Sequence, residues 1–327
     1  ILYTVLYASS SDSRWHESSH GTAFKSAWLN NALYEIASFM VLRQSTVWRW
    51  SHTRHHSDTL VRGRDPEIAA PRPPNIRGIL MNFFALRSAP AEFRKIFIHA
   101  SGRIEKEVAT YLPESEYGKV IWKARLYLLI FAGVLAASLI FSTLLPLMFI
   151  GLPTLVGTWL MPVYGLTQHA GLAENVLDHR LNCRTVYMNR VHRFLYWNMN
   201  YHVEHHMFPL VPYHALPRLH ELMKEDCPKP YGSIAEAYRE IIPTLRKQVK
   251  DPAYFAKRDL PVTAGIVTQE AHILTAERAD ANEEGLIRIC STKQIVPGEV
   301  LRFDLDDQTY AIYCLASDQY YASDGFC

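Results

Sequence analysis

The sequence predicts a mainly α-helical membrane protein with a transmembrane hairpin, followed by a partial all-β module. Three observations support this fold class: a long run without charged residues, histidine motifs at helical spacing, and short β-type runs separated by turn signals near the C-terminus. The 327 residues are enough for two domains. We expect a helical domain at 1–255 and a β-domain at 285–327, joined by a polar linker at 256–284.

The uncharged run extends over 43 residues, from Leu126 to Gln168. A membrane-spanning helix needs about 20 apolar residues, so the run is long enough for two spans. Pro146, Gly151 and Pro153 lie near its middle and suit a turn. We therefore predict a tight transmembrane hairpin, with spans at 126–146 and 150–168. The alternative, a pair of buried helices in a large soluble core, conflicts with the rarity of such uncharged runs in soluble domains.

The charges that flank this run predict its orientation. Arg and Lys are frequent before and after the run, whereas the predicted turn has none. Such residues are enriched on the cytoplasmic side of membranes, so both ends of the hairpin are expected there. The histidine motifs on either side of the run would then share the cytoplasmic face. The net charge of +2 gives no indication of a nucleic acid partner.

The N-terminal part of the chain is less clearly membrane-spanning. The segment 24–42 is long enough to span, but it contains Lys25, Asn30, Asn31 and Glu35. We expect it to lie in the interface or against other helices. The chain begins at Ile1 rather than at Met, and the apolar residues after it resemble the end of a helix. We therefore expect that further spans precede it.

Nine of the fifteen histidines gather at four places in the sequence. "HESSH" has an H-x-x-x-H spacing, whereas "HTRHH" and "HVEHH" both have an H-x-x-H-H spacing. A single histidine follows the uncharged run, in "LTQHAGL". The nine candidate metal ligands are His16, His20, His52, His55, His56, His169, His202, His205 and His206.

This arrangement predicts a metal centre with two ions. Residues three or four apart share one face of a helix, so each motif would direct its imidazoles to one side. One ion takes about four to six ligands, so nine nitrogens suit two ions, and imidazole binds Zn, Cu, Fe and Ni. Two other functions remain open. "HESSH" matches the zinc protease signature with Glu17 as general base, and a metal transporter would also need ligands.

With these three boxes and the extra histidine, the chain resembles the membrane fatty acid desaturase and alkane hydroxylase superfamily over about residues 1–255. The stretches "QHAGLAENVLDHR" and "NMNYHVEHHMFPLVPYHALPRLH" look most like its rhizopine-oxygenase branch. The resemblance implies a histidine-rich diiron centre that uses O2 and two electrons. It would hydroxylate or desaturate a C–H bond of a fatty-acyl or hydrocarbon-like substrate at the bilayer. The branch resemblance also leaves a small polar substrate open.

Carboxylates close to the boxes are candidates to orient the metal-binding imidazoles, because such imidazoles usually donate their second N–H to an acceptor. We name Glu17, Asp178 and Glu204 in this role, with Asp58 and Glu174 as further candidates.

The C-terminal segment resembles the first half of a Rieske ferredoxin. "VPGEVLRFDL", "YAIYCL" and "YYASDGFC" alternate with turn signals at 297–299, 306–308 and 317–319. In that family a cysteine here ligates a [2Fe–2S] cluster with a second cysteine and two histidines. Cys327 is the candidate ligand, and the remaining ligands are expected only in the full-length protein. The resemblance implies that electrons reach the diiron centre from an NAD(P)H-dependent ferredoxin reductase through this tethered module.

Overall fold

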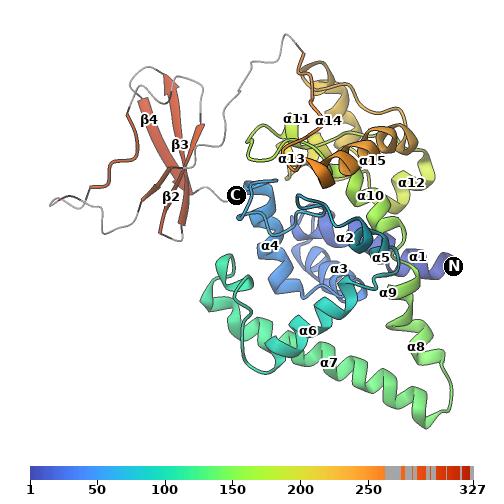
Figure 1. Ribbon diagram of the computed structural model, residues 1–327. Helices are drawn as coiled ribbons and strands as arrows, with labels where there is room; N and C mark the ends of the chain where they lie inside the picture. Colours follow the sequence, from blue (N-terminus) through green and yellow to red (C-terminus); the bar gives the residue numbers. More distant parts are fainter. Residues whose placement is uncertain are drawn as a thin grey trace. The chain divides into compact units, whose positions relative to one another are not determined.

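The computed structural model describes residues 1–261 and, beyond them, residues 274–276, 282, 286–291, 295, 300–306, 308–316 and 319–324. The chain divides into two compact units, Ile1–Val267 and Thr268–Cys327 (Figure 1). The domain boundaries predicted at 255 and 285 stay predictions.

The first unit is built from helices, as the fold class predicted. Its α-helices are α1 (Leu2–Tyr7), α2 (Ser9–Ser19), α3 (Ala27–Met40), α4 (Ser45–Ser57), α5 (Ile76–Met81), α6 (Ser88–Ala100), α7 (Tyr117–Ile140), α8 (Leu145–Phe149), α9 (Leu152–Val156), α10 (Leu160–His169), α11 (His179–Asn182), α12 (Arg190–Tyr196), α13 (His202–Met207), α14 (Leu216–Met223) and α15 (Ile234–Lys250). Short 3₁₀ helices lie at η1 (Asn82–Phe84), η2 (Val108–Thr110), η3 (Glu114–Glu116) and η4 (Lys224–Asp226).

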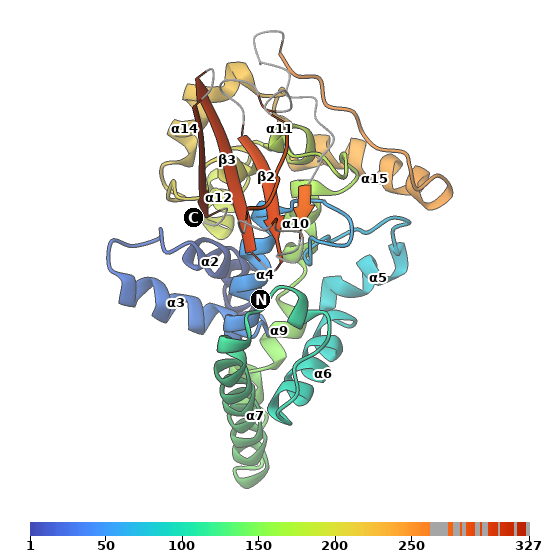
Figure 2. The ribbon, with the colours of Figure 1, turned by 90° about the vertical axis from the view of Figure 1, so that its left-hand side faces the viewer.

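Helix α7 is apolar and long, and it extends away from the helices that carry the histidines (Figures 1 and 2). With η3 it covers Glu114–Ile140 and is the one described helix long and apolar enough to cross a membrane, with a mean hydropathy of 1.8. Its apolar side chains, such as Leu129 and Leu139, are largely exposed. This exposure suits a surrounding of lipid better than a protein core.

The second predicted span, 150–168, is wrong as a single helix. The chain turns back after α7, and α8 packs against it, but the returning segment is divided into α8, α9 and α10. Gly151 has φ +100°, and Pro146 and Pro153 occupy the first turns of α8 and α9. Proline lacks the N–H that a continuous helix would need there, and it clashes with the preceding turn. The first span also ends at Ile140 rather than at 146.

Helix α3 lies within the segment 24–42 and packs against α2, in agreement with a helix resting on other helices. Helix α15 packs against α10. It buries Ala237, Ile241 and Leu245, which recur at i and i+4, against Leu166 and Ala170 at the end of α10. This packing fixes the end of α10, where His169 lies.

The described part of the second unit contains a sheet with the strand order β1-β2-β3-β4. Its strands are β1 (Leu274–Ala276), β2 (Val300–Leu305), β3 (Gln308–Ala316) and β4 (Gln319–Asp324). β2, β3 and β4 pair antiparallel, and β1 runs parallel to β2.

The predicted β-structure near the C-terminus is thus present, and residues 307, 317 and 318 of the predicted turns lie outside the described residues. The turn predicted at 297–299 and the candidate ligand Cys327 lie outside the described residues. β1 falls within the segment predicted as a linker. Four strands do not identify a Rieske fold, so the nature of this module stays a prediction.

Candidate metal centre

The nine candidate ligands come from helices α2, α4, α10 and α13 and their ends. α2 contributes His16 and, at its C-terminal end, His20; α4 contributes His52, His55 and His56; α10 ends at His169; and α13 contributes His202, His205 and His206. The helical spacing turns the imidazoles of each motif toward a common interior. All nine lie in the first unit, and most of their side chains are buried.

Their nitrogens form two groups, and within each group the ligand atoms lie within 4.8 Å of one another. The five-histidine group is His16, His20, His52, His56 and His205. The four-histidine group is His55, His169, His202 and His206. Each H-x-x-H-H motif supplies both groups: its first and last histidines join one group, and its middle histidine joins the other.

The imidazoles meet through their Nε2 atoms. In the four-histidine group, His202 Nε2 lies 2.9 Å from His169 Nε2 and 3.0 Å from His206 Nε2. In the five-histidine group, His16 Nε2 lies 2.8 Å from His205 Nε2. A neutral imidazole has one donor and one acceptor nitrogen, so converging Nε2 atoms cannot all satisfy one another. A metal ion that receives their lone pairs would satisfy them together, and this donor set fits one.

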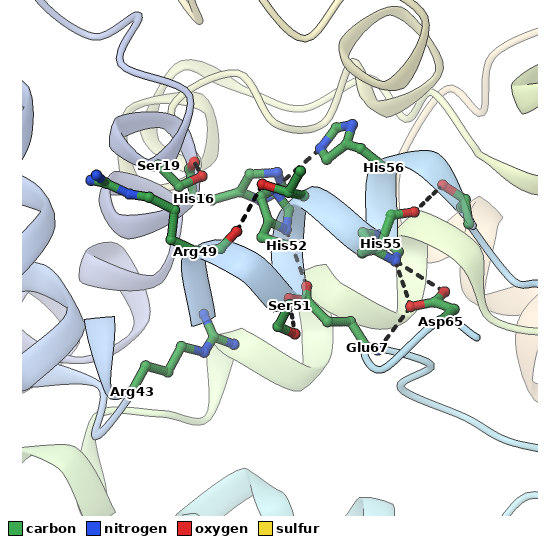
Figure 3. A network of polar contacts seen from close by, with 12 residues as sticks. His16, Ser19, Arg43, Arg49, Ser51, His52, His55, His56, Asp65 and Glu67 are labelled. Carbon is green, nitrogen blue, oxygen red and sulfur yellow. Dashed lines mark hydrogen bonds and ion pairs between the residues drawn. The ribbon is translucent and has the colours of Figure 1, made fainter. Parts of the chain in front are cut away.

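The opposite ring nitrogens hold several of these imidazoles in place. His55 Nδ1 lies 3.0 Å from both carboxylate oxygens of Asp65, and His52 Nδ1 lies 3.1 Å from Glu67 (Figure 3). His169 Nδ1 lies 2.8 Å from the carbonyl oxygen of Asn182. Acceptors at Nδ1 favour the tautomer that carries its proton there and leaves the Nε2 lone pair for a metal.

Thr59 extends this pattern to a fourth imidazole. Its hydroxyl donates to the backbone oxygen of His55 at 2.7 Å and lies 3.1 Å from His206 Nδ1. Because its proton is already used, the hydroxyl oxygen is left to accept from His206. One threonine therefore links the middle histidine of α4 to the last histidine of α13.

Burial keeps most of the imidazoles uncharged, as metal ligation requires. Desolvation, and then the neighbouring imidazoles, hold the pKa values of His16 and His202 well below the usual value. Desolvation and then His55 lower the pKa of His169 to about 3. For His55, desolvation is outweighed by Asp65, and the pKa is raised.

The carboxylates named from the sequence have other partners. Glu17 is buried but accepts from Thr22 Oγ1 at 2.7 Å and from the Tyr213 amide at 3.0 Å. Asp178 caps α11 and pairs with Arg180 at 2.7 Å.

Glu204 is also buried, and it accepts from Thr185 at 2.6 Å and from His220 Nδ1 at 2.5 Å. Asp58 pairs with Arg54 and Arg64, and Glu174 pairs with Arg62 and Arg72. Glu17 and Glu204 each follow a histidine directly within a helix, so their side chains leave on a different face from that histidine.

Sequence reasoning missed the residues that do contact the imidazoles. Asp65 and Glu67 follow α4 in "GRDPE", and the loop folds back so that both reach the helix. Two carboxylates within a dozen residues after a histidine box were the available signal. His179, which is not among the nine predicted ligands, has its ring centroid 5.1 Å from that of His206. The Sγ of Cys183 lies within 4.8 Å of the ligand nitrogens of both, and burial raises the pKa of its thiol.

A cavity of about 370 Å³ opens beside the histidines. His16, His52, His55 and His169 form part of its wall, and apolar side chains such as Leu166 form another part. This volume is at the small end of the range of ligand pockets. The cavity brings a bound molecule next to both histidine groups.

Comparison with known proteins agrees with this arrangement. A family model described as fatty acid desaturase matches residues 1–238. A Delta(5) fatty acid desaturase of Caenorhabditis elegans is 26% identical over 237 residues, which cover 64% of this chain and 53% of the relative. The chain therefore spans about half the length of this curated relative. Because the family model covers well over half of the chain, including every histidine of both groups, the chain belongs to the fatty acid desaturase family.

Proposed function

We propose that this chain is a membrane-bound, O2-dependent oxidoreductase with a non-heme diiron centre, which hydroxylates or desaturates a C–H bond. The observation that carries the proposal is the division of nine histidines into a group of five and a group of four. Family membership points to the same reaction class. The proposed ligands are those nine histidines, and the proposed cofactor is a pair of iron ions.

When bound, two redox-active irons supply the activation of O2, which zinc cannot supply. The residues of this chain hold the centre and shape its surroundings. Asp65, Glu67 and Asn182 orient imidazoles through Nδ1 and leave their Nε2 lone pairs inward. The burial of most of these imidazoles limits the access of bulk water to the centre.

The proposed substrate is a fatty-acyl or hydrocarbon-like molecule in the cavity beside the histidines. Ile68, Ile79, Met161 and Leu166 give this cavity an apolar wall. The Delta(5) fatty acid desaturase relative supports an acyl chain. Helix α7 would anchor the protein in the bilayer, and the Arg- and Lys-rich flanks support a cytoplasmic position for the centre.

The proposed electron source is the C-terminal module. A Rieske [2Fe–2S] domain beginning with β2–β4 and including Cys327 would receive electrons from an NAD(P)H-dependent ferredoxin reductase. Each turnover needs two electrons, and a tether raises the local concentration of a one-electron carrier. The support is the resemblance of "VPGEVLRFDL" and "YYASDGFC" to that family, together with the antiparallel strands.

The alternatives fit the site less well. A zinc protease built on "HESSH" needs Glu17 as a base beside the metal, but Glu17 Oε1 accepts from Thr22 Oγ1 at 2.7 Å and from the Tyr213 amide at 3.0 Å. It also leaves both H-x-x-H-H motifs without a role. A transporter would need metal ligands along its spans, and α7 carries no histidine.

Metal analysis of full-length protein from iron-supplemented membranes tests the proposal. We expect about two non-sulfur irons per chain in a coupled pair by Mössbauer spectroscopy, because two ligand groups are present. His20→Ala and His202→Ala remove one ligand from each group and should each reduce the iron content. His214→Ala is the control, because this exposed histidine belongs to neither group. One zinc and no iron would overturn the proposal.

A further inference from the structure

The cavity beside the histidines also holds a charged residue that the proposed chemistry does not use. Arg43 lines this cavity between two indoles, with its guanidinium carbon 4.1 Å from the Trp15 ring and 4.4 Å from the Trp48 ring. The guanidinium also pairs with the carboxylate of Asp12. Stacking and ion pairing together fix the plane of the guanidinium.

This arginine keeps donors available to the cavity. A guanidinium has five N–H donors. Among the described residues, Asp12 is the side chain that accepts from Arg43, and the contact uses one oxygen. The Arg43 side chain is 18% exposed and that of Asp12 is 21% exposed, so neither is sealed from a molecule in the cavity. A planar cation with free donors matches the two oxygens of a carboxylate.

Arg43 and the histidines lie on one continuous wall. Trp15 lies between Arg43 and His52. Its ring stacks with the Arg43 guanidinium, and its ring centroid lies 5.2 Å from that of His52. In Figure 3, Arg43 and Glu67 lie on the same side of α4, opposite His56, and both line the cavity whereas His56 does not. Since Arg43 and His52 line the same cavity, a molecule held at Arg43 can reach His52.

We propose that Arg43 anchors the carboxylate of a substrate that enters as a free acid, with Asp12 as its resting partner. The inference rests on the proposed function, since it takes the cavity as the place where a C–H bond is oxidised. Among the fatty-acyl or hydrocarbon-like molecules proposed above, the anchor selects those that carry a free carboxylate and fit a cavity of about 370 Å³. Anchoring the head at Arg43 fixes which carbons along the chain reach the histidines.

Equilibrium binding of radiolabelled decanoate and methyl decanoate tests this proposal. The full-length, iron-grown protein is placed in phosphatidylcholine nanodiscs under argon, so that no turnover occurs. We expect decanoate to bind at least about tenfold tighter than the ester, which corresponds to about 1.4 kcal/mol. In Arg43→Gln the two affinities should become equal, and Arg43→Lys should keep part of the difference because it loses the planar fork.

Asp12→Asn separates anchoring from a purely structural role of the ion pair. It removes the competing carboxylate, so decanoate affinity should rise several-fold while ester affinity stays unchanged. A purely structural pair would instead weaken both ligands. Arg49→Gln is the matched control, because Arg49 stacks 4.2 Å from the Tyr34 ring but does not line the cavity. This variant should prefer decanoate over methyl decanoate by the same factor as the wild type.

The outcomes distinguish this inference from the proposed function. Equal binding of acid and ester by the wild type, or a preference that persists in Arg43→Gln, overturns the anchor even if the protein contains iron and consumes O2. A protein that prefers decanoate through Arg43 but holds no iron overturns the oxidoreductase and leaves the anchor in place.

Discussion

Replacing Asp65 by Asn tests whether the loop after α4 prepares the metal centre. Asp65 contacts His55 Nδ1 through both oxygens at 3.0 Å, and its side chain is fully buried. The neutral amide loses a charge-assisted hydrogen bond, which contributes about 1.5–3 kcal/mol. With about 1.4 kcal/mol for each factor of ten, iron affinity in the four-histidine group should fall by about 10- to 100-fold. Losing an outer partner of a metal-binding histidine usually has an effect of this size.

The assay is competition for iron between the protein and a chelator of known affinity. Asp178→Asn is the control, because Asp178 pairs with Arg180 and contacts no imidazole of either group. Asp65 also accepts from the amides of Leu60 and Glu67 at 2.8 Å, so unfolding of both metal-free variants must be compared. Wild-type iron affinity in Asp65→Asn, or an equal loss in Asp178→Asn, would refute the reasoning.

Three further outcomes are expected. Gly157→Ala should lower the melting temperature strongly, since its Cβ would lie 1.9 Å from the Thr4 backbone oxygen; Gly133→Ala, with no atom within 4 Å, should not. Glu204→Gln should lower the free energy of unfolding in urea by about 1.5–3 kcal/mol, because it weakens the hydrogen bonds of Glu204 with His220 and Thr185. Its iron content should stay at the wild-type level. Removing metal with a chelator should lower the melting temperature, and iron should restore it, because a ligand that binds the folded state stabilises it.

The sequence predicts those features of the site that depend only on spacing within a single turn of helix. The i, i+3 and i+4 spacing of His52, His55 and His56 was enough to predict that they face one interior. It could not predict that His55 joins a different group from its two neighbours. That division depends on how α4 meets α10 and α13, which are more than a hundred residues away.

The same limit applies to the carboxylates, and a different one applies to the second span. A carboxylate directly beside a histidine in a helix, such as Glu17 or Glu204, points to another face of that helix. Asp65 and Glu67 reach α4 because the loop that follows this helix folds back onto it. The spacing of residues in the sequence does not predict the path of such a loop. The second span failed for a different reason: hydropathy averages over Gly151 and Pro153, whose effect on the backbone is local.

The interleaving of the two H-x-x-H-H motifs has a consequence for how the protein is made. The five-histidine group is incomplete without His205, and the four-histidine group without His202 and His206. Since the remaining ligands lie between residues 16 and 169, a growing chain holds most of its ligands long before either group can close. Both groups then become complete within five residues of synthesis. Each group is therefore complete only after translation of α13, and a chain interrupted before that helix can complete neither group.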